Sequence, residues 1–112
     1  MDATQIYSQT LSQLGDTLIG MTSAEWDNRL QAASAEERQR AARLMIQTQH
    51  ARLSLGNAVL QGIADQLKTN ESDLTTGIDT LKGTLASLAN VTQVLNTLAS
   101  VLSVVGRIVS LA

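Results

Sequence analysis

Apolar residues recur at alternating spacings of three and four along most of the chain. Such spacings place the residues on one side of an α-helix, because one helical turn takes about 3.6 residues. The pattern predicts long helices over residues 2–19, 35–69 and 73–112, and a shorter segment predicts a helix over residues 23–33. The sequence therefore predicts an all-α protein, a three- to four-helix bundle built as a single domain over residues 1–112.

Local signals mark where two of these helices begin or end. Ser34 followed by Glu37 has the spacing of a capping box, which predicts the start of a helix at residue 35. Gly20 is predicted to end the first helix, because glycine adopts a left-handed conformation there without a steric clash. Trp26 lies in the short helix, and its large apolar area predicts that it covers one end of the core.

The two longest predicted helices carry matching apolar stripes, so we expect them to fold back on each other as an antiparallel hairpin. The polar run at residues 70–73 separates them and favours a turn. Pairing the stripes about this turn places Gln49 opposite Thr92 and Gly56 opposite Leu85. A buried amide without a partner costs on the order of 1–3 kcal/mol. Gln49 and Thr92 are therefore predicted to form a polar pair that fixes the register of the hairpin.

The apolar side of the last helix broadens after about residue 91, beyond what one partner helix covers. Soluble monomers rarely leave so broad an apolar face exposed. The sequence therefore predicts a non-enzymatic interaction or assembly protein, which self-associates or binds a helical protein partner through this face. The residues that form the face are Val94, Leu98, Val101, Val105, Ile108 and Val109. The opposite side carries small hydroxyl and amide groups, which either meet water or let another helix approach closely.

Residues 83–106 contain no charged side chain, since Lys82 and Arg107 flank the segment. A helix of this length spans the roughly 30 Å of the hydrocarbon core of a bilayer. The alternative prediction is a membrane-active protein of pore-forming or lysis type that inserts residues 83–106. Asn90, Gln93 and Asn96 weigh against it, because their amides make the segment amphipathic.

Composition narrows the chemistry that the chain can perform. The 112 residues include no cysteine, which excludes disulfides and thiolate metal sites, and no proline, which leaves long helices uninterrupted. His50 is the single histidine, and its neighbours Gln47, Gln49 and Arg52 supply no acid or nucleophile. No phosphate-binding glycine loop occurs. We therefore expect no enzyme, with no catalytic residue, cofactor or metal.

Charge gives one candidate patch. The net charge of −2 argues against nucleic-acid binding. Basic residues cluster in the middle of the chain, and a patch for an anionic partner is predicted to comprise Arg38, Arg40, Arg43 and Arg52. Glu36 and Glu37 are mixed with them, so the alternative is an ordinary solvated helical face. The first residues lack the features of a signal peptide, and we expect a cytoplasmic protein or one exported by a signal-independent route.

Overall fold

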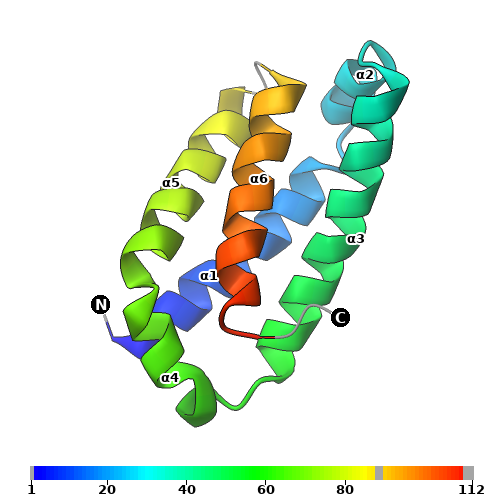
Figure 1. Cartoon of the computed structure of the whole chain (residues 1–112). Helices are drawn as coiled ribbons and strands as arrows, with labels where there is room; N and C mark the ends of the chain where they lie inside the picture. Colours follow the sequence, from blue (N-terminus) through cyan, green and yellow to red (C-terminus); the bar gives the residue numbers. More distant parts are fainter. Residues whose placement is uncertain (1, 88–89, 110–112) are drawn as a thin grey trace.

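The computed structural model of the chain describes residues 2–87 and 90–109. Within these ranges the backbone forms six α-helices and no strand (Figure 1). The helices are α1 (Ala3–Gly20), α2 (Ala24–Gln31), α3 (Ala35–Asn57), α4 (Leu60–Thr69), α5 (Glu71–Ser87) and α6 (Val91–Gly106). The prediction of an all-α helical bundle is confirmed.

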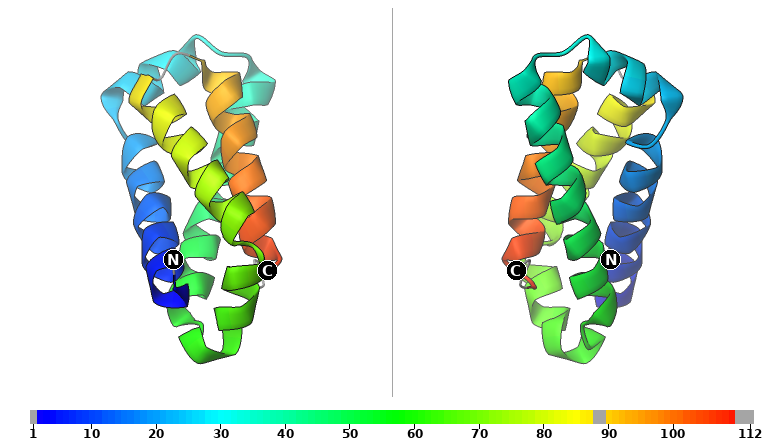
Figure 2. Two further views of the ribbon diagram at one scale, coloured as in Figure 1. Left: turned by 90° about the vertical axis from the view of Figure 1, so that its left-hand side faces the viewer. Right: turned by 90° about the vertical axis from the view of Figure 1, so that its right-hand side faces the viewer.

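Four of the helices run along the length of the molecule and enclose its core (Figure 2). α1 packs between α3 and α5, and α6 packs between the same two helices on the opposite side. α1 and α5 run in one direction, whereas α3 and α6 run in the other. α2 covers the end of the bundle where α6 begins, and α4 lies at the opposite end, where it leads the chain from α3 to α5.

The predicted hairpin of two long helices is wrong. Residues 35–69 form two helices, because Ala58 and Val59 adopt extended backbone with ψ of 144° and 115°. Residues 73–112 fall on α5 and α6, and positions 88–89 and 110–112 of that prediction lie outside the described residues. The helices that fold back antiparallel on each other are α5 and α6.

The predicted polar pair of Gln49 and Thr92 is also wrong. α3 and α6 run parallel, so the first turns of these two helices lie together. Thr92 Oγ1 donates a hydrogen bond to Glu37 Oε2 over 2.6 Å, and Gln49 is exposed. Gly56 does not face Leu85; its closest side-chain neighbour belongs to Leu11 of α1.

The core draws on all six helices. Its fully buried side chains are mostly leucine and valine, as expected for a chain with no phenylalanine. The largest are Trp26, Ile6, Leu14, Leu55, Leu67, Leu74, Leu81, Leu95, Leu98, Val94, Val101 and Val105. Because these side chains come from every helix, the short helices α2 and α4 are integral parts of the bundle.

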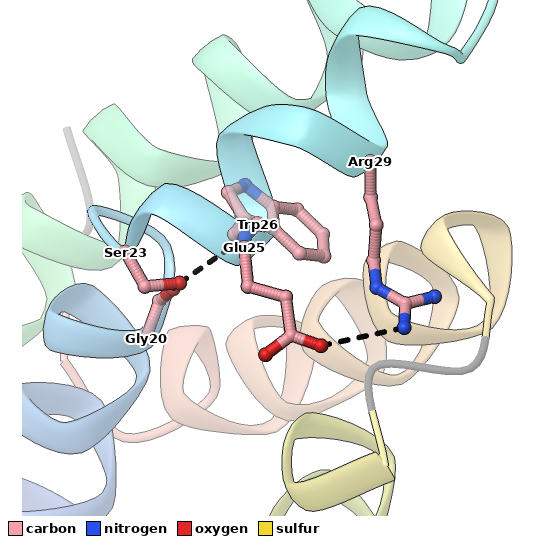
Figure 3. A network of polar contacts seen from close by, with 5 residues as sticks. All are labelled: Gly20, Ser23, Glu25, Trp26 and Arg29. Atoms are coloured by element: carbon pink, nitrogen blue, oxygen red, sulfur yellow. Dashed lines mark hydrogen bonds and ion pairs between the residues drawn. The ribbon is translucent and has the colours of Figure 1, made fainter.

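The turn from α1 into α2 holds Trp26 over the end of the core (Figure 3). Trp26 is 1% exposed, as its size predicts. Ser23 caps α2 by accepting a hydrogen bond from the Trp26 amide, and its hydroxyl donates to the Gly20 carbonyl over 2.8 Å. The predicted left-handed glycine cap is wrong, since Gly20 is the last helical residue and Met21 follows in a right-handed conformation. Gly20 instead faces α5, where an added Cβ would lie 3.6 Å from Leu85 Cδ2.

Candidate interaction surface

The apolar face of α6 that sequence analysis assigned to a partner lies inside the chain's own bundle. Its first four residues are at most 2% exposed, and the last two are partly buried against the core. These six residues are Val94, Leu98, Val101, Val105, Ile108 and Val109. The face is broad because α6 packs against both α3 and α5. The apolar face of α6, which the sequence pattern indicated as excess surface, is therefore covered by the chain's own helices.

The large apolar side chains that are exposed among the described residues are Ile19, Ile46, Leu53 and Val59, and two of them, Ile46 and Leu53, lie on α3. We call the exposed residues at alternating spacings of four and three the outer stripe, which comprises Ala42, Ile46, Gln49, Leu53 and Gly56. Ile46 is 53% exposed and Leu53 is 63% exposed. These two residues lie seven positions apart, so they share one side of the helix. The outer stripe thus presents two large aliphatic side chains to solvent.

α3 buries a second stripe with the same kind of spacing. We call it the inner stripe, and its members are Ala41, Leu44, Thr48, Ala51 and Leu55. Its one polar member is a threonine, whereas the outer stripe contains a glutamine and a glycine, so the inner stripe is the more apolar of the two. Thr48 is accommodated in the core because its hydroxyl donates to the Leu44 carbonyl over 2.7 Å. Sequence reasoning nevertheless selected the stripe that the structure leaves outside.

A groove runs between the outer stripe and α1. Its volume is about 550 Å³, and it is lined by Leu11, Leu18, Gln49, Arg52, Leu53, Gly56 and Asn57. Tyr7 Oη of α1 donates to the Gly56 carbonyl over 3.2 Å, which ties the two helices together beside the groove. The Arg52 guanidinium lies across Gly15, where an added Cβ would be 3.4 Å from Arg52 Nε. Among the described residues, Arg52 is the only charged side chain in the lining.

The four arginines predicted to form an anionic-partner patch do not gather on one face. Arg38, Arg43 and Arg52 are exposed, and Arg40 is half-buried. At about 100° of rotation per residue, these positions point to different sides of α3. Arg38 Nη1 donates to the Ala33 carbonyl over 2.6 Å, whereas Arg52 reaches the groove. The structure thus places a single arginine of the four at the apolar surface.

A second groove, of about 610 Å³, runs along the contact between α5 and α6 and contains part of the polar stripe noted in the sequence. Several of its hydroxyls bond within their own helices, since Thr97 Oγ1 donates to the Gln93 carbonyl and Ser100 Oγ to the Asn96 carbonyl. Asp73 and Arg107 form an ion pair of 3.2 Å across it. These polar groups already have partners, which makes this groove a weaker candidate than the one beside the outer stripe.

Little in the described part of the chain points to chemistry at a site. No group of three His, Asp or Glu side chains in residues 2–87 and 90–109 is arranged to hold a metal ion. His50 is exposed on α3. The Lys68 ammonium donates to the Glu71 carboxylate over 2.8 Å, and this hydrogen bond lowers the pKa of Glu71. That pair lies at the joint of α4 and α5, away from both stripes of α3.

The uncharged segment 83–106 does not form one helix, since it is divided between the end of α5 and the whole of α6. Across the described ranges, no helix has the length and apolar character needed to cross a bilayer. Membrane activity stays a prediction.

Comparison of the chain with protein-family models, curated proteins and solved structures found no match.

Proposed function

We propose that this protein is a non-enzymatic helical assembly protein that self-associates through the outer stripe of α3 and the adjoining α1–α3 groove. The observation that carries the proposal is the exposure of Ile46 and Leu53 at heptad spacing beside a groove lined by leucines. A heptad spacing of large aliphatic side chains is the pattern by which one helix packs against another. A second copy supplies that helix, because in a two-fold interface one patch serves both partners.

The expected affinity follows from the area that remains exposed. Fully burying a leucine or isoleucine contributes about 1.5–3 kcal/mol. Ile46 and Leu53 are 53% and 63% exposed, so about half of that contribution is still available from each. Leu11 and Leu18 in the groove add to it. Association itself costs roughly 4–15 kcal/mol, which these side chains alone do not exceed, so we expect at most a weak dimer.

A charge placed on the outer stripe tests the proposal. Leu53→Glu introduces a carboxylate at the centre of the surface, where a second copy would desolvate it. We expect the dissociation constant to rise at least about tenfold, equivalent to about 1.4 kcal/mol, without loss of helicity. Sedimentation and circular dichroism of each variant measure these two quantities.

Gln47→Glu is the matched control, because it adds the same charge to an exposed position of α3 that lies off the outer stripe. It should leave the dissociation constant nearly unchanged. Equal effects of the two substitutions would show that net charge governs association, and the outer stripe would no longer be the surface.

A further inference from the structure

Aliphatic residues recur every seven positions through the last two thirds of the chain, and this period continues across the ends of the helices. Every seventh residue is aliphatic, and the series is Ile46, Leu53, Leu60, Leu67, Leu74, Leu81, Leu88, Leu95, Leu102 and Val109. Such a period is the pattern of a continuous helix that packs along one side. Leu67 and Leu102 are buried, whereas Ile46 and Leu53 at the start of the series are exposed. The period thus continues from the outer stripe into the core across the joint between α3 and α4.

The joint itself has no residue that stops a helix, although Gly56 and Asn57 just before it favour a helix end. It consists of Ala58 and Val59, with φ of −71° and −75°, values that also suit a helix. Neither residue is glycine or proline, and Val59 caps α4 without a side-chain hydrogen bond. A change of ψ at these two residues would join α3 and α4 into one helix. The bend is maintained by packing, since α4 lies against α1 and α5.

Resting on the self-association proposed above, we infer that a second copy is bound by exchange of halves at this joint. In the exchanged dimer, residues 35–69 form one straight helix, and α4–α6 of each copy pack on α1–α3 of the other. The contacts of α1 with α4 and α5, and of α3 with α6, reform between the copies, so few contacts are lost. Leu53, which is 63% exposed, gains cover where the two straight helices cross.

Substitutions at Val59 distinguish the bent joint from the straight one. Val59→Pro suits the bent joint, because Val59 has φ near that of proline and Ala58 before it is extended. In the straight helix the same proline removes a hydrogen bond and clashes with the preceding turn. We expect Val59→Pro to weaken the dimer by about 100-fold or more and Val59→Ala to leave it unchanged or tighten it, as measured by sedimentation.

Cysteine cross-linking of the isolated dimer decides the topology, and the chain has no native cysteine to interfere. Gly20→Cys with Leu85→Cys spans the two halves, at positions where an added Cβ on Gly20 is 3.6 Å from Leu85 Cδ2. Gly77→Cys with Val101→Cys is the control within one half, because both positions lie on the α5–α6 pair. With a short thiol cross-linker, exchange gives a 20–85 link between chains and a 77–101 link within one chain.

The other outcomes distinguish failure of the exchange from failure of self-association. A dimer whose 20–85 link lies within one chain, and whose affinity survives Val59→Pro, overturns the exchange and leaves side-by-side self-association standing. A chain that stays monomeric at all concentrations overturns both the exchange and the proposed function.

Discussion

Gln13 is the residue that most clearly departs from the apolar character of the core. It is 2% exposed, and its Nε2 donates to Thr17 Oγ1 over 3.2 Å. Its Oε1 is buried and has no hydrogen-bond donor among the described residues. An unpaired buried acceptor costs about 1–3 kcal/mol. α1 therefore carries a local cost to stability that its caps and apolar residues offset.

Replacing this amide by an apolar side chain of similar length should stabilise the bundle. We expect Gln13→Met to raise the free energy of unfolding by about 1 kcal/mol, because it removes the unpaired oxygen. Thr17 Oγ1 keeps its bond to the Gln13 backbone carbonyl over 2.8 Å. Urea denaturation measures the change, and the exposed Gln9→Met on the same helix is the control, expected to stay near zero. A loss of stability at position 13 would show that the amide fixes the packing of α1.

At the scale of elements, the close approach of α5 and α6 depends on a glycine. A Cβ added to Gly77 of α5 would lie 2.9 Å from Val101 Cγ2 of α6, which is too close without movement. Gly83 lies on the same helix and would meet no described atom within 4 Å. Substitutions at these two glycines therefore distinguish the effect of packing against α6 from the effect of intrinsic helix propensity in α5.

Alanine at the two positions should have opposite effects. Gly83→Ala should stabilise the protein by up to about 1 kcal/mol, because alanine is the better helix former. Gly77→Ala gains the same propensity but overpacks the α5–α6 contact, which costs about 1–3 kcal/mol, so we expect a net loss. Thermal unfolding of both variants tests this. Stabilisation by Gly77→Ala would mean that α5 and α6 lie farther apart.

Sequence pattern predicted the start of α3 but missed the start of α6, although Asn90 caps α6 by accepting a hydrogen bond from the Gln93 amide. The Ser34 cap predicted the start of α3, and its hydroxyl accepts a hydrogen bond from the Glu37 amide.

At the joint of α3 and α4, the only local signal is Gly56 with Asn57 at the end of α3, since Ala58 and Val59 both occur in helices and the apolar period continues through them. Packing of α4 against α1 and α5 sets that bend. A local pattern contains no information about such distant contacts.

For the whole molecule, prediction of the candidate site also depended on distant contacts that a local pattern does not contain. The outer stripe was recognised as a helix-packing pattern, because Ile46 and Leu53 have heptad spacing. The inner stripe has equivalent spacing and is slightly more apolar, which was the one indication that it would be buried; the arrangement of four helices decides the outcome. The broad face of α6 was interpreted as excess apolar surface for a related reason. The number of helices that pack around α6 is set by the assembled fold and cannot be inferred from the pattern of α6 alone.

The outer stripe and the adjoining groove form an apolar surface beside α1 and α3, through which we propose that the chain self-associates. The most direct test is the molar mass of the unmodified chain by sedimentation equilibrium, from about 1 µM to about 100 µM. We expect the mass to rise from that of one chain towards that of two over this range. A mass that stays at one chain at the highest concentration would contradict the claim.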